Sequence, residues 1–335
     1  MAKAKPFEII LETNCTCNYS CSFCFADSIQ PKPALPAKTI ETIIEKIASE
    51  GIDRLRFTGG EPLLRKDLAG LLKFAKKQGL FTSLNTNASL FSQQKIKELS
   101  PYLDDVLVSM HAIDSASEQL LGGKPNSFNT KQAAIKALSK EDVFVRAATI
   151  LTPENISQFE LFGKAIEKMP ISQWVLLRPI PNSKNKNPVS IAEMGKAIEK
   201  IYEFNKGKKK EEYSLIENAL PFCCHNPEKT SKVSLGGIRE DGHSTLFIDS
   251  SLSIKPSYFL DLKLGNALND SIMGAWGSDF MKRMRSLEFI AEQCHKCKYV
   301  LECMGGSRFS ALFCNESLYA LDPLAMPEKN TSIFA

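Results

Sequence analysis

Short apolar runs alternate with longer, helically periodic segments along the first part of the chain. Runs of this length predict strands, and apolar residues that recur every three or four positions predict helices. The predicted strands are Phe7–Leu11, Arg54–Phe57, Leu80–Leu84, Val106–Met110, Val143–Ile150 and Trp174–Leu177. The predicted helices are Thr39–Ser49, Leu68–Lys77, Gln93–Leu99, Ser117–Leu121, Thr130–Leu138, Ile156–Met169 and Ile191–Phe204.

This alternation predicts an α/β fold with a parallel sheet, because each parallel crossover needs a connecting helix. A series of six such units favours a partial (βα)6 barrel resembling a TIM barrel, and an open, doubly wound sheet is the alternative. In both arrangements ligands gather at the carboxyl ends of the strands, so the residues that follow each strand are the first candidates for a site.

The alternation stops near residue 205, and the chain beyond it has a different character. A lysine-rich stretch is followed by short strand-like pieces such as Thr245–Ile248 and by one helix-like stretch, Ile272–Leu287. This change predicts a second, small, metal-supported domain. The expected divisions are a barrel over residues 7–205, a linker over 206–214, the small domain over 215–325 and a tail over 326–335.

The composition is that of an ordinary globular protein, with 335 residues and a formal charge of +4. So small a charge gives no sign of a nucleic-acid footprint or a membrane-binding surface. No apolar run approaches the ~20 residues of a membrane-spanning helix, and Phe7–Leu11 is too short for the core of a signal peptide. We therefore expect a cytoplasmic protein without nucleic-acid or membrane partners.

Ten cysteines need a reason in a chain expected in a reducing compartment, where clustered cysteines more often bind metal than form disulfides. They fall into an early group, an adjacent pair and a late group. The early group is Cys15, Cys17, Cys21 and Cys24, the pair is Cys223 and Cys224, and the late group is Cys294, Cys297, Cys303 and Cys314.

Cys17, Cys21 and Cys24 follow the first predicted strand in a single loop. Three thiolates can hold three irons of a 4Fe–4S cluster and leave the fourth iron without a protein ligand. Such an open position is what separates a catalytic metal site from a closed structural one. A structural zinc site or half of a ferredoxin-like site is the alternative for the loop alone. Cys15 lies outside this spacing and is expected to pack as a small apolar residue.

The residues in and after this loop resemble the motifs of a known family. Phe23 stands directly before the last cysteine, and Thr58–Pro62 (TGGEP) follows the second predicted strand. Together they resemble the C-x-x-x-C-x-aromatic-C and GGE motifs of the radical S-adenosylmethionine (SAM) superfamily. The resemblance covers the whole strand–helix region. It implies that Phe23 lies near the adenine of SAM and that the methionine amino group is contacted by Gly59, Gly60 and Glu61.

Further strand ends match places where relatives in this superfamily contact the cofactor. The resemblance implies contacts to the ribose and methionine carboxylate from Asn85, Asn87 and Ser109, and a polar side chain near the cofactor from Arg178. The alternatives are a polar turn at the asparagines and an arginine that extends to solvent. His111 could face the same cavity, although a lone histidine is more often structural.

The late cysteines resemble the cluster segment of SPASM and Twitch domains, which bind auxiliary Fe–S clusters in radical SAM enzymes. The resemblance implies an auxiliary 4Fe–4S cluster on Cys294, Cys297 and Cys303, with Cys314 as the expected fourth ligand. One of the paired cysteines or an open position for substrate is the alternative for the fourth place. A zinc ribbon is the alternative for the whole site.

Three departures reduce the expected number of auxiliary clusters to one. Ser257, Ser307 and Ala325 stand where relatives with two such clusters carry cysteine, and a hydroxyl or a methyl is a poor substitute for a thiolate on iron. The pair Cys223 and Cys224 keeps three interpretations: a cluster ligand, a hydrogen-atom donor to a substrate radical, or buried packing.

The resemblance implies an enzyme that takes an electron from a donor such as flavodoxin or ferredoxin, cleaves SAM to a 5′-deoxyadenosyl radical and removes hydrogen from a substrate C–H bond. Crosslinking or epimerisation of a peptide is the first expectation, although a strand beginning near Phe7 is taken to leave no room for a leader-binding domain. A small-molecule dehydrogenase or epimerase is the second. A non-catalytic Fe–S electron carrier is the hypothesis of another class, and it leaves the Gly-Gly-Glu motif unexplained.

Overall fold

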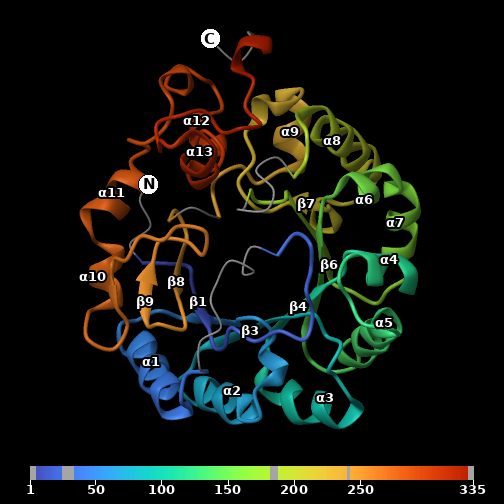
Figure 1. The fold of residues 1–335 in the computed structure, drawn as a ribbon, viewed down its shortest axis with the longest axis vertical. Helices are drawn as coiled ribbons and strands as arrows, with labels where there is room; N and C mark the ends of the chain where they lie inside the picture. The colour runs from blue at the N-terminus through green and yellow to red at the C-terminus, as the bar shows by residue number, and fades with distance from the viewer. Residues whose placement is uncertain (1–4, 25–33, 182–187, 240–241, 331–335) are drawn as a thin grey trace.

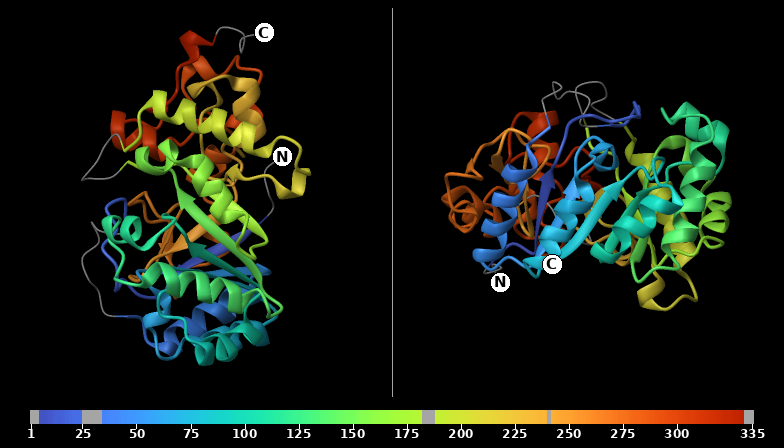
Figure 2. Two further views of the ribbon diagram at one scale, coloured as in Figure 1. Left: turned by 90° about the vertical axis from the view of Figure 1, so that its right-hand side faces the viewer. Right: turned by 90° about the horizontal axis from the view of Figure 1, so that it is seen from below.

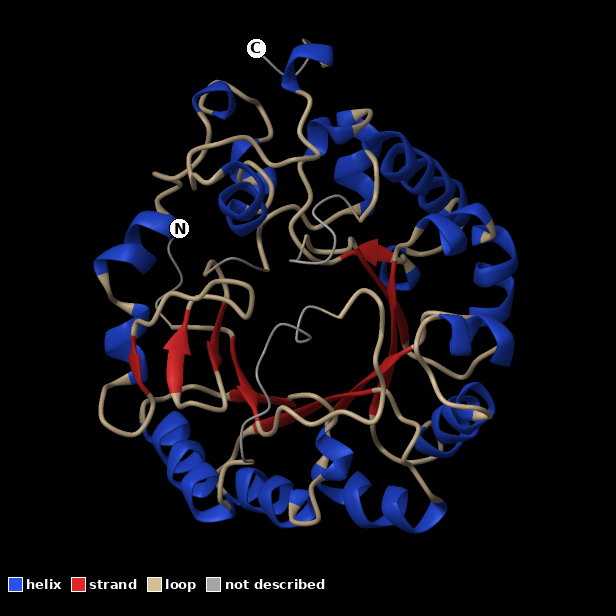
Figure 3. Ribbon diagram, in the orientation of Figure 1, coloured by secondary structure: helices blue, strands red, loops and turns tan. Residues whose placement is uncertain are grey.

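The strands of the protein form one curved sheet with the helices on its outer face. The computed structural model describes residues 5–24, 34–181, 188–239 and 242–330, so residues 331–335 of the expected tail lie outside the described part. The sheet has ten strands in the order β10-β9-β8-β1-β2-β3-β4-β5-β6-β7. Neighbouring strands from β8 through β1 to β7 are parallel, and β9 and β10 add an antiparallel edge (Figures 1 and 3).

The element bounds place loops after β1, β2, β3, β4 and β6 on the same edge of the sheet. The strands are β1 (Glu8–Glu12), β2 (Arg54–Thr58), β3 (Phe81–Thr86), β4 (Asp105–Ser109), β5 (Phe144–Ile150), β6 (Gln173–Leu177), β7 (Leu215–Ile216), β8 (Thr245–Ile248), β9 (Ser253–Lys255) and β10 (Gly265–Asn266). The helices are α1 (Ala37–Ser49), α2 (Leu68–Lys77), α3 (Gln93–Leu99), α4 (Ser115–Leu120), α5 (Ser127–Leu138), α6 (Pro153–Ser157), α7 (Phe159–Ile166), α8 (Ile191–Asn205), α9 (Pro227–Val233), α10 (Ile272–Trp276), α11 (Asp279–Arg285), α12 (Val300–Cys303) and α13 (Arg308–Asn315).

The predicted α/β fold with a partial parallel barrel is confirmed, and each of the six predicted strands lies within two residues of an observed one. The agreement has a simple cause, because the apolar stripe of each helix packs on the outer face of the sheet. In α1 that stripe is Ile40, Ile43, Ile44 and Ile47, all buried in the core together with the outward residues Ile9 and Leu11 of β1.

Two predicted helices are each split in the structure. The segment predicted over Ile156–Met169 forms α6 and α7, with Gln158 between them. The stretch predicted over Ile272–Leu287 forms α10 and α11, because Gly277 ends the first and the Ser278 hydroxyl accepts a hydrogen bond from the main chain to start the second. Apolar periodicity continues through both breaks and therefore does not reveal them.

The chain after residue 205 returns to the sheet at both of its edges. β7 pairs with β6, and β8 pairs with β1, so the expected small domain shares the barrel's sheet. Beyond β10 the chain crosses the open side of the arc towards α9 (Figure 1), and the side view agrees (Figure 2). No helix in the described ranges combines the length and apolar character needed to cross a bilayer.

The inward face of the sheet is polar near the amino ends of the strands. Arg56 on β2 donates to Glu8 on β1 (Nε to Oε2, 2.7 Å) and to Asp105 on β4 (Nη1 to Oδ2, 3.2 Å). Arg146 on β5 donates to both Asp105 oxygens at 2.7 Å. Removing one partner from such a buried network leaves an uncompensated charge, so these strands depend on each other electrostatically.

We expect Asp105→Asn to lower the free energy of unfolding by about 3–5 kcal/mol, because Arg56 and Arg146 would lose their shared buried carboxylate. Burial raises the pKa of Asp105, but hydrogen bonds from Arg146 and the charge of Arg56 outweigh burial and hold it below its ordinary value. A carboxyl with a lowered folded pKa stabilises the fold above its unfolded pKa, and that contribution is lost as pH falls through the folded pKa. As the pH falls below about 4, the free energy of unfolding should therefore decrease less in the variant than in the wild type.

The measurement is urea denaturation of the reconstituted protein, followed by circular dichroism across the acid range. Asp53→Asn is the matched control, since Asp53 pairs with Lys5 at an exposed position and its loss should cost less than about 1 kcal/mol. Equal losses in the two variants would contradict the assignment of a shared buried carboxylate.

Candidate functional site

The loop after β1 carries the early cysteines and is held by the main chain of the turn after β2. Gly60 N donates to Asn14 O (2.7 Å), and Glu61 N donates to Thr16 O (2.8 Å). A Cβ at Gly60 would lie under 3.0 Å from the carbonyl oxygen of Thr16, closer than side-chain carbons approach other atoms. The observed close approach is therefore between the Gly-Gly turn and the cysteine loop itself.

A second glycine turn holds the other half of the same loop. Ser20 N donates to Gly122 O at 3.3 Å, and Gly122 has a positive φ of 95°. A Cβ at this position would overlap the main chain of Ser20. Gly122 was not predicted, and its only signal in the sequence is a Gly-Gly pair directly after a predicted helix.

Glu61 connects the ends of β2 and β3. Its side chain is 1% exposed, and its Oε1 accepts hydrogen bonds from Thr86 Oγ1 (2.7 Å) and Leu63 N (3.0 Å). Its Oε2 accepts a hydrogen bond from Asn87 N (2.8 Å). Burial raises the pKa of Glu61, and these hydrogen bonds partly offset the effect. The carboxylate is thus fixed by three donors, and its contact with SAM stays a prediction.

The other polar strand ends separate into two environments. Asn87 Nδ2 donates to Asn18 Oδ1 (2.9 Å) and lies 3.9 Å from Cys17 Sγ, so this side chain reaches the cysteine loop. Asn85 instead accepts a hydrogen bond from Arg56 (3.0 Å) inside the barrel. Ser109 ends β4 and is half-buried. The structure therefore brings Asn87, and not Asn85, to the early cysteines.

The three early thiols gather at the carboxyl edge of the sheet. Cys17 is exposed, Cys21 and Cys24 are half-buried, and Cys17 Sγ accepts a hydrogen bond from Tyr19 N (3.4 Å). Burial, followed by the neighbouring Cys24 and Cys17 sulfurs, raises the pKa of Cys21 to about 12. The three thiols therefore belong to one loop, and the sulfurs of Cys24 and Cys17 lie near enough to Cys21 to influence its pKa.

Single-ion sites and cluster sites make different demands on these donors. In the part of the chain that the structure describes, no three Cys, His, Asp or Glu side chains are placed to hold a metal ion. The fit to a cluster rests on the donors themselves, which are three thiols of one loop. Thiolates are the ligands that iron–sulfur clusters take, so the donor set has the right chemistry.

Phe23, within the cysteine loop, packs against His111. Their rings meet edge to face, with centroids 4.7 Å apart. Burial and the nearby Lys131 lower the pKa of His111 to about 3, so the imidazole is neutral. Its Nδ1 accepts a hydrogen bond from Ile150 N (3.2 Å), which fixes the ring in place.

A buried ion pair lies behind the cysteine loop and was not predicted. Lys131 on α5 and Glu118 on α4 form a salt bridge with side chains 1% and 3% exposed. The Lys131 Nζ also lies 5.0 Å from the centroid of the Tyr19 ring. Nothing in the sequence distinguishes Lys131 from the solvated lysines of other helices, because its partner is 13 residues away on another helix.

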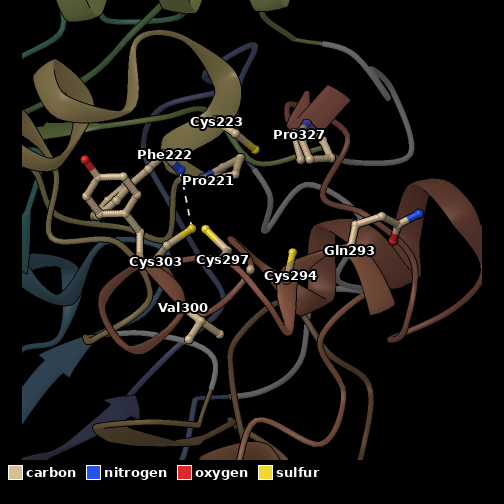
Figure 4. A pocket seen from close by; sticks show the side chains of 12 residues that line it. Pro221, Phe222, Cys223, Gln293, Cys294, Cys297, Val300, Cys303 and Pro327 are labelled. Atoms are coloured by element: carbon tan, nitrogen blue, oxygen red, sulfur yellow. Dashed lines mark hydrogen bonds between the residues drawn. The ribbon is translucent and has the colours of Figure 1, made fainter. Parts of the chain in front are cut away.

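Three of the four late cysteines line one cavity. Cys294, Cys297 and Cys303 lie on its wall together with Cys223, from the short 3-10 helix Phe222–Cys224. Figure 4 shows the four sulfur atoms directed into one space. Burial raises the pKa of Cys223 to about 11 and that of Cys303 to about 12.

Cys314, the expected fourth ligand, is not among the residues that line this cavity. It lies on α13, which follows the last cavity cysteine by several residues. The geometry therefore places Cys223, and not the expected Cys314, beside the other three. Sequence distance hid this arrangement, because Cys223 precedes Cys294 by a long stretch that includes three strands.

Arg178 and Cys15 occupy positions that differ from their first interpretations, whereas Cys224 agrees with one of its three, buried packing. Arg178, expected beside the cofactor, donates to Asp322 Oδ2 (2.7 Å) and Ala219 O (3.1 Å) in a fully buried ion pair. Cys224 packs in the main hydrophobic core. Cys15 lies 2.9 Å from Ser250 Oγ, so it makes a polar contact rather than packing as an apolar residue.

Comparison with known proteins identifies the family. Residues 11–165 match the sequence model of the Radical SAM superfamily, and this range contains the cysteine loop and the Gly-Gly-Glu turn. By sequence the chain is similar to an AdoMet-dependent heme synthase of Nitratidesulfovibrio vulgaris, with 22% identity over 94% of this chain and 91% of that protein.

Two solved structures share the fold over almost the whole chain. One is Streptococcus suis SuiB bound to S-adenosylmethionine, with a TM-score of 0.79 and 20% identity, covering 96% of this chain and 78% of SuiB. The other is anSMEcpe with bound AdoMet and the Kp18Cys peptide, with a TM-score of 0.77 and 18% identity, covering 97% of this chain and 95% of that one. With the family match and the motifs at its site, residues 11–165 form a domain of the Radical SAM superfamily.

Proposed function

We propose that this protein cleaves SAM reductively at a 4Fe–4S cluster held by Cys17, Cys21 and Cys24 and removes a hydrogen atom from a substrate C–H bond. The superfamily implies such a cluster and SAM. When bound, the cluster supplies the electron that breaks a C–S bond of SAM and gives a 5′-deoxyadenosyl radical. The observation that carries the proposal is a loop that bears three cysteines and is held by glycine turns at the carboxyl edge of a parallel sheet.

The chain's own residues position the reactants and limit side reactions. Gly60 and Gly122 hold the cysteine loop through main-chain contacts, so its backbone is positioned before any ligand binds. Glu61 offers a fixed carboxylate near the methionine end, and Phe23 offers an apolar ring for the adenine. Placing reactants in advance is the main contribution of a protein to cofactor chemistry, because it removes the entropy cost of orientation.

The second half of the proposal is one auxiliary 4Fe–4S cluster on the late cysteines, within a SPASM- or Twitch-like domain over residues 215–325. The support is the cavity lined by Cys294, Cys297 and Cys303. An external one-electron donor such as a flavodoxin or ferredoxin would deliver the electrons. The departures at Ser257, Ser307 and Ala325 limit the number of auxiliary clusters to one.

A peptide is the substrate class that we place first, with crosslinking or epimerisation as the reaction. The support is the shared fold with SuiB, which has been solved with the precursor peptide SuiA, and with anSMEcpe bound to a peptide. The second candidate is oxidation or epimerisation of a small molecule. It is favoured by the match to AdoMet-dependent heme synthase, which extends over 94% of this chain.

We expect Cys21→Ala to abolish the formation of 5′-deoxyadenosine, because the first cluster would lose one of its three ligands. The measurement is product formation from SAM after anaerobic reconstitution with dithionite, quantified by liquid chromatography and mass spectrometry. Cys15→Ala is the matched control and should keep wild-type product formation, since Cys15 contacts Ser250 instead. Product formation by Cys21→Ala at the wild-type rate would overturn the assignment of the first cluster.

We expect Gly60→Ala to lower 5′-deoxyadenosine formation by about 100-fold, because the new methyl group must push the cysteine loop out of position. Iron bound at the first cluster should fall as well. Gly70→Ala is the control, since Gly70 lies on α2 and a methyl group added there would meet no atom within 4 Å. That variant should keep full activity and gain up to about 1 kcal/mol of helix stability. Equal activity of the two variants would show that the loop is not held as described.

The two substrate classes are separated by isotope transfer. Cells of the source organism would be grown in deuterated medium, and their peptides and small metabolites would be offered separately to the protein with unlabelled SAM. We expect deuterium to enter 5′-deoxyadenosine with the peptide fraction, and a peptide to lose two daltons or exchange one hydrogen. Deuterium transfer from the small-molecule fraction alone would show that the substrate is a small molecule and not a peptide.

A further inference from the structure

The cavity of the late cysteines is bounded by two separate parts of the chain. One wall is the segment Pro221–Cys223, which follows β7 at the edge of the barrel sheet. The other wall consists of Cys294, Cys297 and Cys303, which lie between α11 and α13, and of Ala325 and Pro327 from the chain after α13. The two walls touch, because Phe222 N donates to Cys303 Sγ at 3.4 Å (Figure 4). A thiol therefore faces the late cysteines from outside their own segment.

The position of Ala325 explains why an outside thiol is needed. Ala325 lines the same cavity as Cys223, and its side chain has no donor atom. A methyl group cannot bind iron, so the late segment, residues 294–325, brings only three thiols to the cavity. Cys223, on the opposite wall of the cavity, can supply the fourth thiol.

The Cys223 segment is fixed in the position that this role requires. Asn330 Nδ2 donates to the carbonyl oxygen of Cys223 (2.9 Å) and to that of Met326 (3.2 Å), which ties the segment to the chain end beyond Ala325. The adjacent Cys224 N donates to Pro221 O (3.1 Å) and closes the short helix. Close by, the buried Arg178–Asp322 pair joins the end of β6 to the late segment. The two walls are thus held together by contacts that do not involve the thiols.

We propose that Cys223 is the fourth ligand of the auxiliary 4Fe–4S cluster, with Cys294, Cys297 and Cys303 as the other three. This inference rests on the auxiliary cluster of the proposed function. On binding, each thiol loses its proton to solvent and its sulfur binds one iron, with no change in oxidation state. The fourth thiol then comes from the barrel side of the cavity.

Four thiolate ligands have two consequences for the enzyme. Every iron of the cluster has a protein ligand, so the cluster transfers electrons or supports the fold and does not bind substrate directly. A sulfur that binds iron carries no hydrogen, so Cys223 is not the hydrogen-atom donor. Because its ligands come from both walls, the cluster also joins the late segment to the barrel.

The test isolates the second site in the full-length chain. In a chain with Cys17, Cys21 and Cys24 all changed to alanine, we expect about four irons and four sulfides per molecule after anaerobic reconstitution. Adding Cys223→Ser should reduce this to three irons or fewer, with the electron paramagnetic resonance signal of an oxidised three-iron cluster or with no cluster. Adding Cys314→Ser instead should leave all four irons and an unchanged Mössbauer spectrum.

A rescue experiment separates a lost ligand from a lost fold. Adding Ala325→Cys to the Cys223→Ser chain should restore four irons, because the new thiol lines the same cavity. Any one of four results would overturn the proposal. These are four irons in the Cys223→Ser chain, loss of iron in the Cys314→Ser chain, failure of the rescue, and zinc in place of iron. None of these measurements involves SAM cleavage, so failure here is distinguishable from failure of the radical chemistry.

Discussion

The main-chain contacts between the cysteine loop and two glycine turns are the constraint on which the site depends. Gly60 meets the loop at Thr16 and Gly122 meets it at Ser20, and neither position has space for a Cβ. Hydrogen bonds from Gly60 N, Glu61 N and Ser20 N hold both halves of the loop. The main chain around Cys17 is therefore held in place relative to the sheet.

The sheet supplies the frame for this constraint. Parallel strands direct their carboxyl ends to one edge, so the turns after β1, β2 and β3 meet there. Glu61 joins two of these turns through Thr86 and Asn87, and Asn87 continues to the cysteine loop. Deeper in the barrel, Arg56 and Arg146 share the carboxylate of Asp105, which holds the strands together beneath the site. The site and the network beneath it thus rest on the same parallel strands.

Local patterns predicted most of the barrel, because they depend on neighbours in sequence. The strands β1 to β6 and the helices α2 and α3 follow directly from apolar periodicity, and the cysteine loop and Gly-Gly-Glu turn are visible as motifs. What escaped prediction depends on contacts between distant residues. Arg178 pairs with Asp322 across 144 positions, and Lys131 is buried only because Glu118 meets it from another helix. Cys223 likewise reaches the late cysteines through the return of the chain to the sheet, which no local pattern reveals.

The central claim is that three thiols hold the first cluster and leave one iron open to SAM. Electron–nuclear double resonance of the reduced protein with SAM that carries ¹⁵N in its methionine amino group tests this directly. We predict a ¹⁵N coupling to the cluster that appears with labelled SAM and is absent in a Cys17→Ala chain. A fully loaded first cluster that shows no coupling to the amino nitrogen would contradict the claim.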